Sequence, residues 1–159
     1  MFDFGYLTRT FLLLWKAVPT TLIITVVSLA IGSVLGFFIA LARVNKIKVL
    51  SQLGRTYVSV IRGTPVVLQI LVVYSIVPSL LNVMFKNAGS DINIFEMDPI
   101  VYAFVVFSLN MAGTLSEVFR SAILTVNQGQ LEAGYTSGLT FAQTYRRIII
   151  PQALTAAIP

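Results

Sequence analysis

The chain has 159 residues, of which 57% are hydrophobic and only 11% are charged, and it contains neither Cys nor His. A soluble domain normally carries about 25% charged residues, so the composition argues against a single water-soluble core, a disordered chain and a disulfide scaffold. The lack of His and Cys removes the usual zinc ligands and the usual thiol and imidazole catalysts, so we expect neither a metal site nor catalytic residues. The composition indicates an integral membrane protein or a piece of one.

The segment before the first apolar run does not resemble a secretory signal peptide, because no basic start is followed by a small-residue cleavage site. Tyr6, Phe11 and Trp15 are residue types that favour the membrane interface. Pro19 is suited to the first turn of a helix. We therefore expect an interfacial helix here, followed by a first span that begins near Pro19.

Three uncharged runs are long enough to cross a membrane, which takes about 17 to 25 residues. They cover residues 18–42, 63–85 and 99–116. A fourth run, 148–159, has 12 residues before the sequence stops. Because a helix that ends in lipid leaves its last carbonyls without partners, we expect a truncated fourth span, with a short interfacial end as the alternative. The expected fold class is all-α, one polytopic transmembrane helical bundle over residues 1–159, with spans at about 18–42, 63–85, 99–118 and 148–159.

The charges beside the spans predict the topology. The 43–62 loop has five Lys or Arg residues and no acid, whereas the 86–98 loop has three acids and one Lys. Since basic loops favour the cytoplasm, the first loop is expected inside, the second outside and the N-terminus outside, despite Arg9 and Lys16. The net charge of +5 is thus explained by membrane topology, and we expect no nucleic-acid partner.

Small residues recur every four positions in the first span, at Ser28, Gly32, Gly36 and Ala40. Such a face lets two helices approach closely in lipid. The partner helix belongs either to another subunit or to the same chain.

The second span begins with the sequence Arg62-Gly63-Thr64-Pro65. This pattern predicts a break between a short helix at about 52–61 and a longer helix from Pro65. The N-terminus of the longer helix would suit a carboxylate or another anion, whereas the alternative is an ordinary interfacial kink.

Polar side chains inside the spans are few, and in lipid they usually face a bundle interior or a pathway. Thr64, Gln69, Asn110 and Glu117 are the candidates for a translocation pathway. Arg120 lies three residues after Glu117, within reach on the same helix face, so this pair is read mainly as structural.

The 127–145 segment, which precedes the fourth run, predicts two short helices joined by a glycine turn. Asn127 and Gln130 are spaced as in a capping box, and Thr140 and Gln143 repeat the spacing. Gly138 suits the left-handed residue after a helix end. The two helices either present Leu131 and Tyr135 to a partner's groove or pack on their own bundle.

The residues of this segment resemble the EAA loop of ABC-importer permeases, a pattern written E-A-A-x3-G-x9-I-x-L-P. The chain has Glu132-Ala133-Gly134, then Gly138 after three residues and Ile148, Ile150 and Pro151 at the matching spacing. It departs from the pattern at Gly134 and Ile150. Arg62-Gly63-Thr64-Pro65 with Gln69, and Glu117-Val118-Phe119-Arg120, are similar to stretches of the polar amino acid uptake permeases.

The resemblance implies a permease subunit of a type I importer in the cell membrane, with its coupling loop in the cytoplasm. Carried over by position, Glu132, Ala133 and Gly134 fall in the ATPase-coupling helix and Gly138 in its turn. The implied partners are an ABC ATPase that binds ATP and Mg²⁺, an extracytoplasmic solute-binding protein, a second permease subunit, identical or different, and a polar amino acid as substrate. The chain itself has no Gly-x4-Gly-Lys-[Ser/Thr] loop, so no nucleotide cofactor is expected in it and it is not expected to be an enzyme.

Two other function classes are weighed against this one. An ion-coupled secondary transporter or channel would have charged residues deep in its spans, where this sequence has only amides and hydroxyls. A membrane-embedded enzyme would need a nucleophile–base pair or a set of metal ligands. Because the composition offers neither, an enzyme is the least favoured of the three classes.

Overall fold

The computed structural model describes residues 3–89 and 94–157, and all its regular secondary structure there is helical, as the composition predicted. The elements are α1 (Phe4–Val44), α2 (Lys48–Gly63), α3 (Val66–Asn87), a 3-10 turn η1 (Ile94–Glu96), α4 (Pro99–Thr125), α5 (Gln128–Thr136), α6 (Phe141–Thr144), a π-helical turn η2 (Tyr145–Ile149) and α7 (Ile150–Ala157). Ile158 and Pro159 of the expected fourth span, and Asp91 of the expected outer loop, lie outside the described residues.

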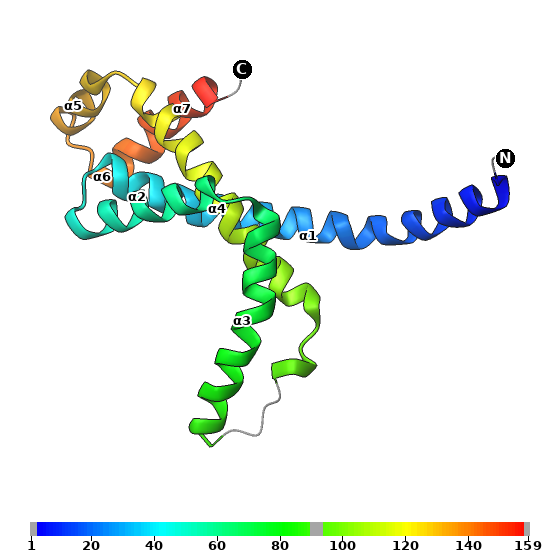
Figure 1. Ribbon diagram of the computed structural model, residues 1–159. Helices are drawn as coiled ribbons and strands as arrows, with labels where there is room; N and C mark the ends of the chain where they lie inside the picture. Colours follow the sequence, from blue (N-terminus) through cyan, green and yellow to red (C-terminus); the bar gives the residue numbers. More distant parts are fainter. Residues whose placement is uncertain (1–2, 90–93, 158–159) are drawn as a thin grey trace.

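The helices form three arms that meet where α1 crosses α4 (Figure 1). The N-terminal half of α1 is one arm, the α3–α4 hairpin is the second, and α5, α6 and α7 gather in the third beside the end of α4. The α1–α2 turn lies on the side of the third arm, away from the start of α1 and the tip of the hairpin. This arrangement is compatible with the alternation of sides that the loop charges predict.

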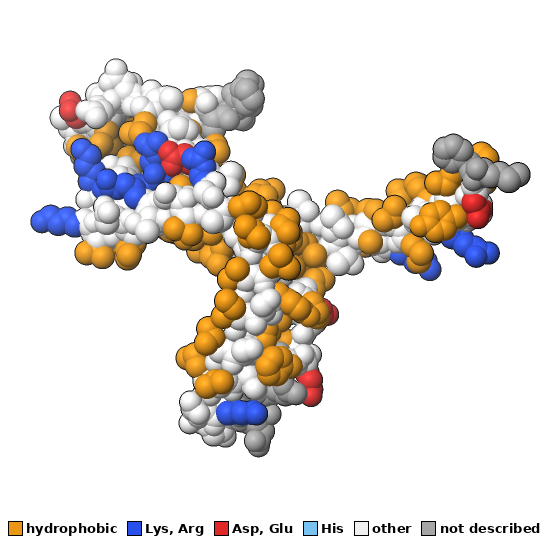
Figure 2. Space-filling view, in the orientation of Figure 1, with side chains coloured by type: hydrophobic (Ala, Val, Ile, Leu, Met, Phe, Trp, Pro, Cys, Tyr) orange, Lys and Arg blue, Asp and Glu red, His pale blue; other side chains and the backbone are white. Residues whose placement is uncertain are grey.

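Three of the described helices, α1, α3 and α4, are long and apolar enough to cross a membrane, with hydropathies of 2.6, 2.1 and 1.5. Most of their large apolar side chains are exposed, and Figure 2 shows apolar side chains along the α1 arm and the α3–α4 hairpin. Exposed apolar surface of this extent is too large for a water-soluble monomer, and it suits contact with lipid or with other membrane helices.

The prediction of a separate interfacial helix before Pro19 is wrong, because α1 is one helix from Phe4 to Val44 with Pro19 inside it. The proline costs the helix one hydrogen bond. In lipid no water replaces a lost bond, so an unbroken helix satisfies more backbone groups than a break would. The hydroxyl of Thr21 donates to the Ala17 carbonyl at 3.1 Å, across the turn that contains the proline.

The small-residue face of α1 packs against α4 of the same chain, which decides between the two alternatives for this face. Ser28, Gly32, Gly36 and Ala40 are all buried. A Cβ added at Gly36 would lie 2.9 Å from the Ala112 carbonyl oxygen and 3.1 Å from the Ser116 nitrogen. The matching face of α4 also has small residues, Ser108, Ala112 and Ser116, each at most 5% exposed. The two backbones are therefore close enough that only small side chains fit between them.

A second cluster of apolar residues holds the third arm on the end of α4. Ala122 and Ile123 of α4 pack with Tyr145, Ile149 and Ala153 of the η2–α7 segment. The α5–α6 segment is therefore attached at both of its ends to one packed unit.

We expect Gly36→Ala to destabilise the fold by about 1–3 kcal/mol, because the added methyl group overpacks the α1–α4 crossing. Gly63→Ala is the matched control, since a Cβ there would meet nothing within 4 Å. Thermal unfolding of both variants in detergent measures the difference. An equal melting temperature for Gly36→Ala and the unmodified protein would contradict the close approach of the two helices.

Candidate functional site

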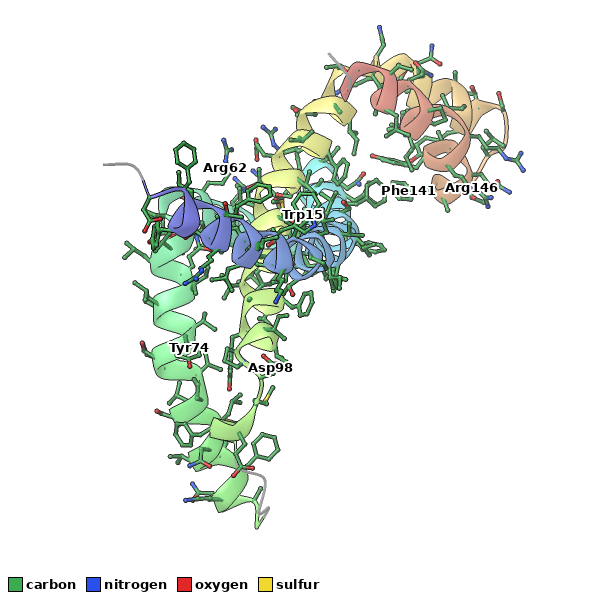
Figure 3. All side chains as sticks on the ribbon, turned by 90° about the vertical axis from the view of Figure 1, so that its right-hand side faces the viewer. Trp15, Arg62, Tyr74, Asp98, Phe141 and Arg146 are labelled. Atoms are coloured by element: carbon green, nitrogen blue, oxygen red, sulfur yellow. The ribbon has the colours of Figure 1, made fainter. Side chains whose placement is uncertain are left out.

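The helix break expected at the start of the second span is present. Helix α2 ends at Gly63, and Thr64 and Pro65 are both extended before α3 begins at Val66. A residue before proline is disfavoured in the α conformation, which explains why Thr64 leaves the helix. Figure 3 shows Arg62 at the upper end of α3, with Tyr74 and Asp98 further along the hairpin.

The side chain of Gln69 closes this break. Its Nε2 donates to the Ile61 carbonyl at 3.0 Å, the Thr64 carbonyl at 3.1 Å and the Thr64 hydroxyl at 2.8 Å. These carbonyls end α2 and have no partner within the helix, so the amide acts as their cap. Gln69 thus holds the end of one helix with a side chain from the next.

The same amide is bound to α4. Its Oε1 accepts a hydrogen bond of 3.1 Å from Asn110 Nδ2. One turn earlier on α2, the hydroxyl of Tyr57 donates to the Leu109 carbonyl at 2.5 Å. The structure therefore brings together three of the four candidate pathway residues, Thr64, Gln69 and Asn110. They are bound to one another, so a solute that used the amides would have to replace these bonds.

Glu117, the fourth candidate, belongs to a different cluster. Its Oε2 accepts from Arg43 Nη1 of α1 at 2.7 Å, and its Oε1 accepts from Arg120 Nε at 2.8 Å. The expected Glu117–Arg120 pair forms, and Arg43 adds a link between α1 and α4. Removing one member of a partly buried pair leaves a charge without its partner, so this link is costly to break.

The 127–145 segment has the expected two helices and glycine turn. The Asn127 side chain accepts from the Gly129 nitrogen at 2.8 Å and caps α5, and Thr140 and Gln143 form the full capping box at α6. Gly138 has a φ of +78°, which side chains with a Cβ rarely adopt. Gln130, expected to complete the first box, instead accepts a bond from Gln152 of α7. These caps give a short segment a defined shape without a core of its own.

The alternative that α5 packs on its own bundle holds for one face of the helix. Leu131 packs against the apolar cluster at the end of α4, and Gly134 is buried. Glu132 and Ala133 are exposed, and so is Tyr135, at 45%. One face of α5 is thus fixed to its own bundle and the other remains available to a partner.

Gly134 lies against the helix that follows α5. A Cβ there would lie 2.4 Å from Thr144 Cγ2 and 2.8 Å from Thr144 Oγ1. Thr144 is fully buried, and its hydroxyl donates to the Thr140 carbonyl at 3.0 Å. The absence of a side chain at 134 therefore sets how near α5 lies to α6.

The next residue connects this contact to the α1–α2 turn. The Tyr145 hydroxyl donates to Asn45 Oδ1 at 3.2 Å, and its ring lies 4.4 Å from that of Phe141. Burial of Tyr145 raises its pKa above the usual tyrosine value, so the hydroxyl stays protonated at neutral pH. Figure 3 shows Phe141 and Arg146 in this third arm. The coupling-loop candidates are thus mechanically connected to α1 as well as α4.

Sequence reasoning missed Arg43, Tyr57, Thr144 and the Asn45–Tyr145 pair. Each acts through a contact between residues more than 50 apart or, for Thr144, across a turn between two helices. A lone Tyr or Thr carries no spacing signal of such a contact. Only Arg43 carried a clue, because it is the first charged residue after an apolar run.

The chain is similar to known proteins. A family described as "Binding-protein-dependent transport system inner membrane component" matches residues 32–159. The L-cystine transport system permease protein TcyL of Bacillus subtilis (strain 168) is 39% identical over 89% of this chain and 56% of its own length. The octopine transport system permease protein OccM of Rhizobium radiobacter is 35% identical over 99% of this chain and 63% of its own length. The chain thus spans little more than half of the first relative.

A solved structure has the same arrangement of helices. It is described as the crystal structure of an amino acid ABC transporter with histidines. It superposes on the whole of this chain and on 68% of its own, with a TM-score of 0.72 and 29% sequence identity.

We expect Gly134→Ala to shift or destabilise α5, because the new methyl group would collide with Thr144. This reverses the usual order of helix propensity, in which Ala stabilises a helix interior by about 1 kcal/mol relative to Gly. Thr144→Ala in the Gly134→Ala background should restore part of the loss by removing the two nearest atoms. Melting temperature and protease resistance of the loop measure both effects, and a more stable Gly134→Ala single variant would contradict the contact.

We expect Gln69→Leu to loosen the α2–α3 break, because it leaves the carbonyls of Ile61 and Thr64 and the amide of Asn110 without their partner. These groups are partly buried or exposed, so the expected effect is local opening of the break and not global unfolding. Hydrogen exchange of residues 60–70 should rise, while exchange in α5 stays unchanged as the internal control. Unaltered protection at the break would show that the amide does not close it.

Proposed function

Because this multi-pass membrane chain belongs to the family of binding-protein-dependent transport system inner membrane components, we propose that it is a permease subunit of an ATP-driven importer of a polar amino acid. The observation that carries the proposal is the α5 helix, which has one face fixed to its bundle and an exposed face with Glu132 and Ala133. Two relatives named as cystine and octopine transport permeases favour an amino acid or a related compound as the solute.

The proposed partners follow from the division of labour in such an importer. A separate ATPase binds ATP and Mg²⁺ and docks on the exposed face of α5 in the cytoplasm. A second permease subunit completes the pathway, and an extracytoplasmic binding protein delivers the solute near the α3–α4 tip. In this proposal the chain contributes no catalysis, and its helices line the pathway and move when it opens.

The contacts of the third arm provide a route for the coupling. A push on α5 reaches Thr144 through Gly134, because no side chain separates them. It then reaches the α1–α2 turn through Tyr145 and Asn45, and α4 through the apolar cluster around Ile123. Packed elements with few soft contacts transmit a displacement instead of absorbing it.

The pathway side of the proposal concerns the α2–α3 break. An amino acid offers a carboxylate and an ammonium group, which suit the α3 N-terminus and an amide oxygen. Gln69 and Asn110 are the residues of the break that can exchange a bond with each other for a bond with a solute. We propose that this exchange accompanies the opening of the pathway.

We expect Glu132→Lys to abolish co-purification of the ATPase and reduce uptake at least tenfold, because it reverses the charge on the exposed face of α5. Membrane insertion and melting temperature should stay unchanged, since the side chain is exposed. Uptake of a panel of labelled amino acids by the reconstituted complex, including its binding protein, is the measurement. Normal uptake with a normally bound ATPase would contradict the coupling role.

The turn after α5 offers a matched control pair. Gly138→Asn keeps a residue that tolerates positive φ, whereas Gly138→Val does not. We expect transport to survive the first change and fail with the second. Ion-driven uptake without ATP would instead favour a secondary transporter.

A further inference from the structure

The ends of the three apolar runs meet in one groove. Arg43 is the first charged residue after the first run, Arg62 precedes the second, and Glu117 follows the third. All three line a groove of about 460 Å³ between α1, α2 and α4, together with Arg55 and Ser59 of α2. Since a charged residue at the end of a span lies at the level of the lipid headgroups, the groove lies at that level.

The groove has an excess of positive charge. Its lining holds three guanidinium groups and one carboxylate, and Glu117 is already paired with Arg43 and with Arg120 beside the groove. Arg55 donates two long bonds of 3.4 Å to Ser51. The described residues offer no carboxylate within ion-pair distance of Arg55 or Arg62. Figure 2 shows basic side chains around one acidic group over α2 and the neighbouring part of α4.

One nitrogen of Arg43 has no hydrogen-bond partner among the described residues. This nitrogen is Nε, which is buried, although the same guanidinium binds Glu117 through Nη1. Because Nε is buried, a ligand in the groove would bind instead through the exposed guanidinium groups of Arg55 and Arg62, which need acceptors. An oxygen-rich anion supplies such acceptors and matches the planar fork of arginine.

Helix α2 has the two faces of an interfacial helix. Arg55, Ser59 and Arg62 follow one side at helical spacing. Another side exposes Val49, Leu53 and Val60, which are 70%, 61% and 57% exposed. An apolar groove of about 330 Å³, lined by Phe38, Leu53 and Tyr57 among others, runs between α1 and this apolar side. A phospholipid combines the same two chemistries, a phosphate and an acyl chain.

From this arrangement we propose that the arginine groove formed by Arg43, Arg55, Ser59 and Arg62 binds the phosphate of an anionic phospholipid of the cytoplasmic leaflet. The headgroup lies between α2 and the α1–α4 crossing, and an acyl chain follows the apolar side of α2. A free phosphate would satisfy the arginines but would gain nothing from the apolar side, which is why we assign a lipid. The site would hold α2 at the membrane surface beside the break closed by Gln69.

The test uses the full-length protein in detergent, titrated with phosphatidylglycerol or phosphatidylcholine, with bound lipid counted by native mass spectrometry. We expect tight binding of phosphatidylglycerol only. The double variant Arg55→Gln/Arg62→Gln should weaken it about 10- to 30-fold, because each basic residue near an anionic headgroup contributes about 1 kcal/mol, and a tenfold change corresponds to about 1.4 kcal/mol.

Arg146→Gln/Arg147→Gln is the matched control, since it removes the same charge from two exposed residues beside another apolar run. It should weaken binding less than threefold. An equal loss in both double variants, or equal binding of the two lipids, overturns the site in favour of general surface attraction. Displacement of the lipid by millimolar glycerol phosphate overturns it in favour of a soluble anion.

A third variant separates binding from folding. Arg55→Lys/Arg62→Lys keeps the charge but loses the planar fork, so it should fold normally and retain part of the preference for phosphatidylglycerol. Loss of the preference in the glutamine variant at an unchanged melting temperature supports the site. Two results together overturn the site. The glutamine variant loses both lipid binding and melting temperature, and the lysine variant keeps its melting temperature but shows no preference between the two lipids. The outcome does not depend on whether the protein transports an amino acid.

Discussion

The close approach of α1 and α4 is the constraint on which the rest of the structure depends. Lipid tails are as apolar as leucine, so helices in a membrane associate through fine packing and polar contacts and not through burial from water. Small residues on both helices, Gly36 and Ala112 among them, bring the two backbones into contact. The polar contacts of Asn110, Leu109 and Glu117 all use α4 as one partner. A wider spacing would therefore move the helix break, the Glu117 cluster and the third arm together.

Much of the fold could be predicted from the sequence. Long uncharged runs predict membrane helices, and the Gly-Thr-Pro sequence predicts the helix break because a residue before proline is disfavoured in the α conformation. The sequence also indicated the glycine turn at Gly138, which depends on a backbone angle that few residues adopt. It misplaced the start of α1, since Pro19 stops a helix in water but is tolerated where no water replaces the lost bond. It could not reveal the Arg43–Glu117 or Tyr145–Asn45 pairs. Their partners are 74 and 100 positions apart in the sequence, and local sequence patterns do not predict contacts at such separations.

The candidate residues divide according to what their side chains already bind. Gln69 and Asn110 look like free amides in a sequence, yet the structure uses both to close the α2–α3 break. Glu132 is different, because its backbone belongs to a capped helix and its side chain is exposed. A residue bound within its own chain acts by releasing or keeping those bonds, whereas an exposed residue acts by meeting a partner. In the proposed function, the two sets therefore belong to different steps of transport.

Helix α2 connects these steps physically. One end of it is capped by Gln69 at the break, and the other follows the α1–α2 turn that Tyr145 holds through Asn45. A Cβ at Gly113 of α4 would lie 2.6 Å from Ile61, so α2 has little room to slide on α4. A displacement of the turn must then appear as rotation or tilt of α2, and Gln69 is the contact that this motion would strain first. The α1–α2 turn held by Tyr145 and the α2–α3 break closed by Gln69 are thus the two ends of one short helix.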